Sequence, residues 1–519
     1  MSELDLASLE NAVRSLPNRY KGPGGVVGVV KDGKVILKQA WGYADLENRR
    51  PMDAGTLMPI CSISKQFTCA ILLDLVGDPA KLDHRLAEFL PNLKDRRPTV
   101  ADLCNNQSGL RDYWAMTVLH GAAADGVFRR EDALPLLARM THTHFAPGSH
   151  YSYSNGNFRI LLDLIETESG RPLAELYREK LFGPAGMKTA VLAADTSAPL
   201  NGVIGYEGSD TVGFFPAANR IFWSGDAGIA ATLDDMLAWE IFIDSTRDEA
   251  NGIYNRISTP QPFSDGTPSR YGYGIAREDV GGIDVTGHGG ALRGFRARRL
   301  HSASERVSVV VMFNHDADAH AAALSVMKAA LGQSDEQPKG STTDAGWSGS
   351  YLDPASGLVV QVTAGPEKIE ASFAGGPETL TLGEDGIARS SSMTLARDSD
   401  AIRMERAGEN LKTVAVRITG AVREDIAGHF VSDELGASLD IVAAGNAFCG
   451  SFDGFLGKGA MHPIYAVGED VWVLACRRSM DAPAPGDWTI RIHRDDKDQV
   501  KGLTIGCWLA RHVDYRKAV

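Results

Sequence analysis

A polar segment near residue 340 divides the 519-residue chain into two parts with different patterns. Residues 332–346 (GQSDEQPKGSTTDAG) show no hydrophobic periodicity and are rich in Gly, Ser, Thr and Asp, which is typical of a linker. Helical and strand patterns are mixed before this segment. After it, short alternating runs are broken by Gly, Asp and Pro. We therefore expect a mixed α/β domain at residues 1–331, a linker at 332–346 and all-β structure beyond.

The first part has strand patterns near both ends and helical patterns between them. Strand patterns occupy residues 24–44, 283–289 and 306–314, and apolar residues recur at helical spacing in 62–76, 157–170 and 230–245. Within the first strand pattern, Asp32-Gly33 is a signal for a two-residue hairpin turn. This arrangement predicts one α/β domain that ends near Leu331.

The second part contains an internal similarity. Gly349-Ser350-Tyr351 opens one β-rich run and Gly428-His429-Phe430 opens another, so that SYLDPASGLVVQV resembles HFVSDELGASLDIV. We interpret this as two antiparallel β-barrel domains, at residues 347–420 and 421–519. A single larger β-sandwich is the alternative.

The net charge and the cysteine pattern limit the partners and the cellular compartment that we expect for this protein. A formal net charge of −13 argues against nucleic-acid and anionic-membrane partners. The six cysteines have no CxxC spacing, so we expect free thiols. The N-terminal stretch MSELDLASLENAVRSL lacks the apolar core of a signal peptide, and no later run approaches the length of a membrane span. These features lead us to expect a cytoplasmic protein that acts on small substrates.

The most informative motif is Ser62-Ile63-Ser64-Lys65. A serine hydroxyl needs a base to become nucleophilic, and a lysine three residues later lies on the same face of a helix. A helix that begins at Ser62 would also aim free N–H groups at a developing oxyanion and lower the pKa of the lysine. The motif alone is weak, because Ser325-Val326-Met327-Lys328 repeats it inside a helical pattern. We interpret that second copy as structural.

Tyr153-Ser154-Asn155 follows the loop signature of residues 147–149. A phenol beside Lys65 can relay a proton to a leaving nitrogen, and Asn155 can hold the lysine or the substrate carbonyl. Two ordinary loop residues are the alternative.

His288-Gly289-Gly290 follows a strand pattern. Two glycines permit close approach of a ligand to the strand backbone, and the N–H of Ala291 can complete an oxyanion hole with that of Ser62. The imidazole can orient a substrate or the tyrosine. A glycine-rich turn with an incidental histidine is the alternative.

Together the three motifs resemble the SxxK, YxN and Lys- or His-containing motifs of the penicillin-recognising serine hydrolases. The resemblance covers about residues 20–331 and implies a β-lactamase/penicillin-binding-protein-like α/β catalytic domain. It implies Ser62 as nucleophile, Lys65 as proton donor and acceptor, Tyr153 in the proton relay and His288 as the third motif. The segments MPICS, KQFTCA and LCNNQSGLRDYW, with the two β domains, resemble the bacterial D-aminopeptidases of peptidase family S12 in particular.

Two further positions concern the choice of substrate. Carboxypeptidases and β-lactamases of this family commonly carry Thr or Ser where this chain has Gly289, and that hydroxyl helps to bind a substrate carboxylate. An aminopeptidase instead needs a negative group for the substrate's α-ammonium. In the similar aminopeptidases this group lies on a loop of the last β domain, which matches residues 477–487 (RRSMDAPAPGD) and makes Asp481 the candidate. A solvated loop aspartate is the alternative.

The resemblance therefore implies a serine aminopeptidase that removes small N-terminal D-amino acids, such as D-alanine, from peptides, amides or esters through an acyl-enzyme on Ser62. It needs no cofactor or metal. It further implies inhibition by β-lactams, a homodimer, and substrate binding by Asp481, Asn155, Gly290 and Ala291. An esterase, a β-lactamase or a D-alanyl-D-alanine carboxypeptidase on the same fold is the alternative, and a non-catalytic scaffold protein is a more remote one.

Overall fold

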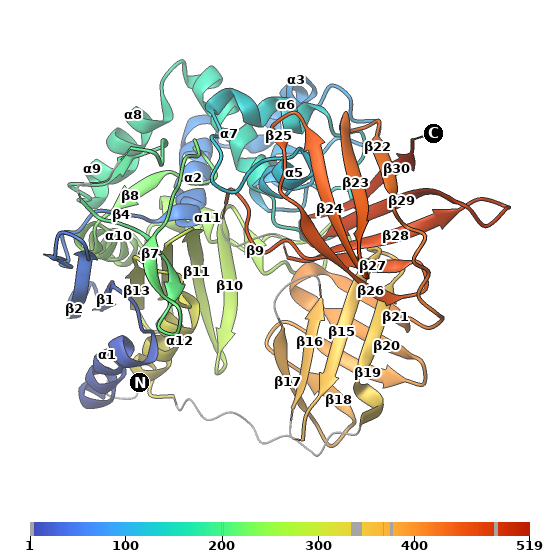
Figure 1. Ribbon diagram of the computed structural model, residues 1–519. Helices are drawn as coiled ribbons and strands as arrows, with labels where there is room; N and C mark the ends of the chain where they lie inside the picture. The colour runs from blue at the N-terminus through green and yellow to red at the C-terminus, as the bar shows by residue number, and fades with distance from the viewer. Residues whose placement is uncertain are drawn as a thin grey trace.

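The computed structural model of the chain describes residues 5–198, 200, 202–333, 345–366, 368–373, 377–481 and 486–518. An α/β part, coloured blue through green to dull yellow in Figure 1, is followed by a yellow-to-orange β-rich part and an orange-to-red β-rich part. The predicted domain limits at residues 331 and 420 fall between elements, whereas the limit at 346 lies within the 3-10 turn η5 (Ala345–Trp347), and we retain all three as proposals. Of the predicted linker, residues 334–344 lie outside the described residues.

An eight-stranded antiparallel sheet forms the centre of the α/β part, in the order β3-β2-β1-β13-β12-β11-β10-β9. The hairpin predicted at Asp32-Gly33 joins β1 to β2, and both turn residues have the positive φ (50° and 71°) that a tight hairpin turn requires. The strand bounds are β1 Gly24–Lys31, β2 Lys34–Asp45, β3 Arg50–Pro51, β9 Tyr271–Gly272, β10 Ile275–Val280, β11 Ile283–Leu292, β12 Phe295–Ser302 and β13 Val307–Phe313.

Helices cover both faces of this sheet. Alternate residues of β1 are buried on opposite sides: Val27 and Val29 pack with α1 (Leu6–Arg19) and α12 (Ala319–Ala330), whereas Val26 and Val30 belong to the larger core. That core includes α2 Ser64–Val76, α3 Leu86–Phe89, α4 Val100–Cys104, α5 Tyr113–Leu119, α6 Ala133–Ala138, α7 Asn155–Ser169, α8 Leu173–Tyr177, α9 Gly183–Ala185, α10 Leu233–Ser245 and α11 Ile253–Ile257. The helices predicted at 62–76, 157–170 and 230–245 correspond to α2, α7 and α10. Across the described residues, no helix combines the length and apolarity needed to cross a membrane.

Two small sheets complete the α/β part beside the larger core. One has the order β4-β8-β5 and the other pairs β6 with β7. Their bounds are β4 Met58–Pro59, β5 Val191–Leu192, β6 Tyr206–Ser209, β7 Gly213–Pro216 and β8 Ile229–Ala231.

Two antiparallel barrels follow, so the prediction of two barrels rather than one sandwich is confirmed. The first is closed by β14 Gly349–Asp353, β15 Leu358–Ala364, β16 Ile369–Phe373, β17 Glu378–Leu382, β18 Ile387–Arg389, β19 Thr394–Asp398, β20 Ala401–Arg406 and β21 Leu411–Arg417. In the second, the strands follow the order β23-β22-β30-β29-β28-β27-β26-β24, pairing of β23 with β24 closes the ring, and the short β25 is attached to β24. The strand bounds are β22 Gly428–Ser432, β23 Ala437–Ala444, β24 Ala447–Gly454, β25 Gly457–Lys458, β26 His462–Gly468, β27 Val471–Leu474, β28 Trp488–Arg494, β29 Val500–Cys507 and β30 Ala510–Lys517.

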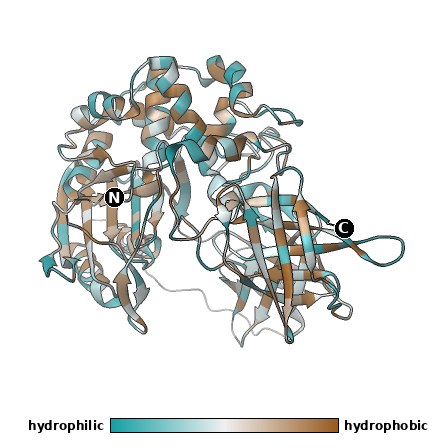
Figure 2. Cartoon of the chain, turned by 45° about the horizontal axis from the view of Figure 1, so that its top comes forward, coloured by the Kyte–Doolittle hydropathy of each residue, from teal (hydrophilic) through white to brown (hydrophobic). Residues whose placement is uncertain are grey.

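The strands of both barrels alternate between residues that face the barrel core and residues that face outward. Buried and less buried residues alternate along β16 and β22, and Figure 2 shows hydrophobic and hydrophilic residues alternating along the barrel strands. The internal similarity seen in the sequence corresponds to the opening hairpin of each barrel. Gly349 pairs with Val362 in one hairpin, and Gly428 pairs with Ile441 in the other.

Both barrels contact the α/β part through backbone hydrogen bonds. The N–H of Tyr151 donates to the carbonyl of Glu409 in the first barrel (3.1 Å), and the N–H of Asp112 donates to the carbonyl of Leu509 in the second (2.9 Å). The buried Arg111 side chain also donates to the carbonyl of Arg511 (2.9 Å). The last barrel therefore rests directly on the segment that precedes α5.

Candidate active site

Ser62 lies in a single 3-10 turn, η1 (Cys61–Ile63), which leads into α2. The α-helix begins at Ser64, two residues after the predicted start near Ser62, and ends at Val76 as predicted. Cys61 has φ 52°, an uncommon conformation for a non-glycine residue that is found preferentially at functional sites. Ser62 itself is half-buried and therefore accessible to a ligand.

Lys65 is fully buried below Ser62, and its Nζ donates to Ser62 Oγ at 3.1 Å. The same Nζ donates to Asn155 Oδ1 (2.7 Å) and to the backbone carbonyl of Asp226 (2.6 Å). Burial lowers the pKa of Lys65 to about 8, although the negative charges nearby oppose this shift. A substantial fraction of this lysine is therefore the neutral amine, and hence a base, near pH 8.

Tyr153 also approaches the serine, and the Ser62 side chain lies close enough to its hydroxyl to lower the pKa of the phenol against the effect of burial. Its ring lies 4.8 Å from Lys65 Nζ. Burial raises the pKa of Tyr153 well above its usual value, so this residue remains a neutral phenol. Asn155 is the first residue of α7, so it is not the ordinary loop residue of the alternative interpretation.

Two buried carboxylates that the sequence analysis missed surround Lys65. Asp112 Oδ1 accepts from the backbone N–H and the Nδ2 of Asn155 (2.6 and 3.0 Å), and burial raises its pKa to about 6. Asp226 Oδ2 accepts from Tyr113 (2.9 Å), and burial raises its pKa as well. Asp112 carries a sequence signal, because it stands at the N-cap position before the helical pattern of α5. We find no comparable sequence signal for Asp226.

His288 lies on β11, and its ring is 6.1 Å from that of Tyr153 between centroids. Its Nδ1 is 2.6 Å from the carbonyl oxygen of Gly289, which makes Nδ1 the protonated nitrogen. Nε2 then accepts from the hydroxyl of Tyr271 at 3.0 Å, a contact absent from the sequence analysis. Burial lowers the pKa of His288 to about 3, so the ring is neutral.

The part of β11 next to the serine has an open edge. Within the described sheet, β10 pairs only with residues 283–287, whereas β12 pairs with residues 286–292 on the other side. The strand also passes very close to η1, because a Cβ on Gly290 would lie 2.3 Å from the carbonyl oxygen of Ile60. At Gly289 the nearest atom to a Cβ would be 3.5 Å away, so this position has room for a side chain. Ala291 is half-buried on the same open edge.

Asp481 lies within electrostatic reach of the serine. Its negative charge raises the pKa of Lys65, Tyr153 and Cys61. Ser479 Oγ donates to the Asp481 carbonyl at 2.9 Å. Residues 482–485 of the predicted 477–487 loop lie outside the described residues. The structure therefore brings all eight predicted site residues to one region around Ser62.

The second SxxK copy behaves differently. Ser325 is buried within α12, and its hydroxyl donates to the carbonyl of Ala322 at 2.9 Å. This geometry supports the structural interpretation of that copy.

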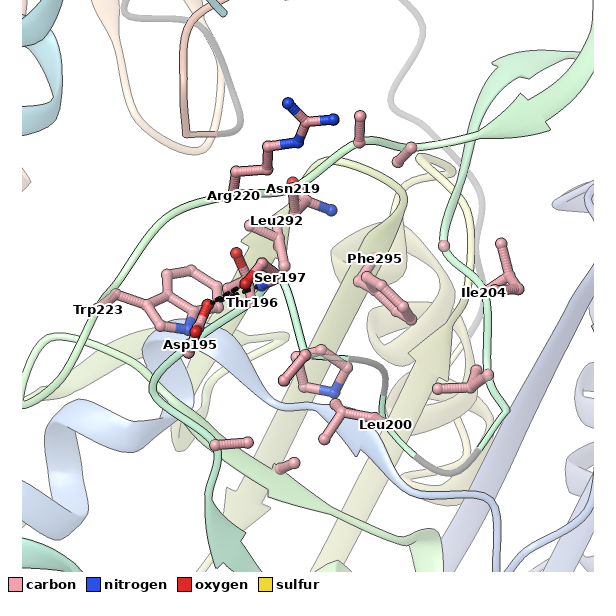
Figure 3. Close-up of a pocket in the computed structure, with 18 of the residues that line it drawn as sticks. Asp195, Thr196, Ser197, Leu200, Ile204, Asn219, Arg220, Trp223, Leu292 and Phe295 are labelled. Carbon is pink, nitrogen blue, oxygen red and sulfur yellow. Dashed lines mark hydrogen bonds between the residues drawn. The ribbon is translucent and has the colours of Figure 1, made fainter. Parts of the chain in front are cut away.

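A cavity of about 320 Å³ lies beside the site. Figure 3 shows Trp223, Leu292 and Phe295 among its lining residues, with Asn219 at one side. It touches the site through Pro59 and Leu292, but its described lining contains none of the four predicted catalytic side chains. The catalytic geometry lies along β11 and η1 rather than in this cavity.

Comparison with known proteins agrees with this geometry. The β-lactamase family matches residues 9–332, and the family described as D-aminopeptidase, domain B, matches residues 341–516. A D-aminopeptidase of Cereibacter sphaeroides is 56% identical over 518 residues, with 99% of each chain covered. A D-aminopeptidase of Brucella abortus is 54% identical over 518 residues, with 100% of each chain covered.

Solved structures share the fold at low sequence identity. The D-amino acid amidase of Ochrobactrum anthropi SV3, complexed with D-phenylalanine, aligns with a TM-score of 0.53 and 20% identity over 64% of this chain and 99% of that one. The octameric penicillin-binding protein homologue from Pyrococcus abyssi aligns with a TM-score of 0.54 and 18% identity over 88% of this chain and 99% of that one. The predicted β-lactamase-like fold is thus confirmed, and the full-length relatives show that the chain belongs to the D-aminopeptidase family.

Proposed function

We propose that this protein is a serine aminopeptidase that removes small N-terminal D-amino acids from peptides, amides and esters. The observation that carries the proposal is the contact of 3.1 Å between Lys65 Nζ and Ser62 Oγ, made by a lysine whose pKa is lowered to about 8. Such a lysine can take the serine proton as Ser62 attacks the first carbonyl of the substrate.

Tyr153 complements this base. Because its pKa is raised, the phenol keeps its proton, and its place beside Ser62 suits it to pass a proton between Lys65 and the leaving amine. The N–H groups of Ser62 and Ala291 are our candidates for the oxyanion hole, with Gly290 allowing the close approach of β11 to η1. Water then hydrolyses the acyl-enzyme.

The site favours a substrate with a free amine over one with a free carboxylate. Gly289 offers no hydroxyl, and the neutral His288 offers no positive charge for a carboxylate. Asp481 supplies a negative charge near Ser62 that can pair with an α-ammonium. We propose that the substrate lies along the open edge of β11, with its amine toward Asp481 and its leaving group toward His288.

The proposal is tested with D-alanine p-nitroanilide, its L-isomer and a peptide ending in D-alanyl-D-alanine, each assayed with the purified enzyme and the Ser62→Ala variant. Release that depends on Ser62 and occurs only from the D-anilide is expected. Release only from the C-terminal substrate would make the protein a carboxypeptidase. Preferential turnover of nitrocefin or p-nitrophenyl esters would make it a β-lactamase or an esterase, and absence of any acylation would favour a scaffold role.

The loop at 477–487 is proposed to restrict the cleft to a single N-terminal residue. Its deletion is expected to admit longer or carboxypeptidase-type substrates. An unchanged substrate profile after deletion would contradict this role.

Compartment, inhibitors and assembly remain part of the proposal. All six cysteines lie in the described residues as free thiols, which supports a reducing compartment and hence the cytoplasm. We propose that β-lactams inhibit the enzyme by acylating Ser62, which mass spectrometry of the intact protein can detect. A homodimer is also proposed, and light scattering in solution tests it.

A further inference from the structure

The loop that carries Asp481 is fixed to the α/β part over its first residues. Ser479 and Met480 are buried (5% and 2% exposed), and Met480 belongs to the larger core, which the α/β part and the last barrel share. Met480 Cε also lies next to Gly126 of the α/β part, 3.4 Å from where a Cβ on that glycine would be. Cys476 is also buried and donates through Sγ to the carbonyl of Arg478 at 3.3 Å. These contacts leave Arg478 projecting from a short, packed segment that ends at Asp481.

Arg478 reaches two carboxylates of the α/β part. Its Nε and Nη2 donate to the two oxygens of Glu207 (3.3 and 2.9 Å), and its Nη1 and Nη2 donate to the two oxygens of Asp125 (3.4 and 3.1 Å). The Arg478 guanidinium therefore makes a two-point contact with each of two carboxylates. Glu207 is 13% exposed, so one side of this arrangement is shielded from solvent.

Arg293 connects the same acids to the strand on which we place the substrate. It is 5% exposed, and its Nη1 lies 2.6 Å from Asp125 and 3.9 Å from Glu207. It follows Leu292, the last residue of β11, and its backbone carbonyl accepts from Asn219 Nδ2 at 2.9 Å. Asn219 is visible at the side of the cavity in Figure 3. Two arginines and two acids thus join the Asp481 loop to the end of the open edge of β11.

We propose that Arg478 is a positioning residue for specificity, and that its ionic contacts with Glu207 and Asp125 hold Asp481 at the place where the substrate's α-amine binds. This inference rests on the proposed function and adds the part of the α/β domain that fixes the loop. The four residues Arg478, Glu207, Asp125 and Arg293 are called the clamp below.

The clamp is more constrained than an isolated surface ion pair, although Arg478 (48% exposed) and Asp125 (52% exposed) are themselves open to solvent. An isolated exposed pair contributes little, because solvent screens it and two side chains lose freedom. In the clamp, two forked contacts share one guanidinium, and Arg293 is already buried and ordered beneath them. Loss of Arg478 is therefore expected to loosen the segment from Arg478 to Asp481 and shift the carboxylate of Asp481, while the strands of the barrel stay folded.

The test compares Arg478→Ala with Arg477→Ala. Arg477 is the matched control, because it is the neighbouring arginine, its side chain is 75% exposed and its described ion pair is with Asp487 of the same loop. For Arg478→Ala we expect the KM for D-alanine p-nitroanilide to rise about three- to tenfold with kcat nearly unchanged. Arg477→Ala should leave both constants unchanged.

A substrate without an amine separates positioning from general damage. Hydrolysis of p-nitrophenyl acetate should keep the same kcat/KM in Arg478→Ala, because no amine contact is involved. Glu207→Gln should raise KM in the same way, and the double variant should be no worse than the more affected single one, since both remove one interaction. Arg478→Lys should recover part of the loss, because it restores the charge without the fork.

The outcomes separate the clamp from the proposed function. If Asp481→Asn raises KM for the anilide but Arg478→Ala does not, the clamp is refuted and the amine site stands. Equal loss with p-nitrophenyl acetate, or an equal effect of Arg477→Ala, also refutes the clamp. If Asp481→Asn leaves KM unchanged, or if no turnover depends on Ser62, the proposed function fails and the clamp fails with it.

Discussion

Replacement of Asp112 by asparagine would test the electrostatic environment of the proposed base. Asp112 Oδ1 accepts from Asn155 Nδ2 at 3.0 Å, and Asn155 Oδ1 accepts from Lys65 Nζ at 2.7 Å. With about 2.2 Å between the oxygen and nitrogen of an amide, these contacts place the two charges at most about 8 Å apart. Asn155 therefore bridges the buried carboxylate of Asp112 and the buried amine of Lys65 through two hydrogen bonds.

The size of the effect follows from this separation. Coulomb's law gives about 0.5 kcal/mol in a medium like water and about 2 kcal/mol at an effective dielectric constant of about 20. Those energies correspond to about 0.4 to 1.5 pH units. Asp112, with a pKa of about 6, is ionised where Lys65 titrates near 8, and its charge raises the pKa of Lys65. Asp112→Asn should therefore lower the pKa of Lys65 further.

The assay is the pH dependence of kcat/KM with p-nitrophenyl acetate, which has no amine of its own to titrate. Because the neutral lysine is the base, activity should rise with pH through about 8 in the unmodified enzyme, and Asp112→Asn should move this rise to lower pH. The maximal rate should also fall, because an amide no longer offers Asn155 the same acceptor.

A second N-cap provides the control. Asp112 caps α5 and Asp318 caps α12, each by accepting a backbone N–H, and each Asp→Asn change keeps a residue that caps a helix about as well as aspartate. Only Asp112→Asn should move the pH profile. A profile that stays in place, or moves to higher pH, in a folded Asp112→Asn variant would refute the electrostatic reasoning.

Three other predictions concern the strand, the substrate amine and the core. Gly290→Ala should abolish most activity, because its Cβ would lie 2.3 Å from the carbonyl oxygen of Ile60. Gly289→Ala should be tolerated, because the nearest atom to its Cβ would be 3.5 Å away. Similar kcat values for the two variants would contradict this reasoning. With D-alanine p-nitroanilide, kcat/KM should fall again at alkaline pH as the substrate's α-ammonium loses its proton, and the acetate ester should lack this fall. Glu240→Gln should lower the free energy of unfolding, measured by urea denaturation, by about 3–5 kcal/mol, because Glu240 and Arg299 form an ion pair in which both side chains are 0% exposed. A loss below about 1 kcal/mol would show that the core accommodates the unpaired arginine.

The residues that sequence could identify are those with local patterns. Ser62 and Lys65 share one helical turn, and the opening hairpins of the two barrels keep similar spacing between their paired residues. Such features depend on neighbours along the chain, so periodicity and motif spacing reveal them. The predicted start of α2 is two residues early, because the 3-10 turn η1 leads directly into the α-helix and has the same apolar spacing.

The residues that sequence missed depend on distant contacts. Asp226 contacts Lys65 through its own backbone carbonyl and Tyr113 through its side chain, across separations of more than a hundred residues. Tyr271 reaches His288 only because β9 and β11 belong to the same sheet. In each case tertiary structure, not a local pattern, creates the contact, and no spacing in the sequence encodes it.

The last barrel reaches the proposed site by two routes, and this affects how its function should be dissected. From one side its loop brings Asp481 toward Ser62, and from the other its Leu509 carbonyl accepts from the backbone of Asp112, which orients Asn155 and thereby Lys65. Removal of the whole barrel would therefore disturb the base as well as the amine site. Excision of the loop alone leaves the Asp112 contact in place, so of these two deletions only loop excision can separate substrate specificity from catalysis.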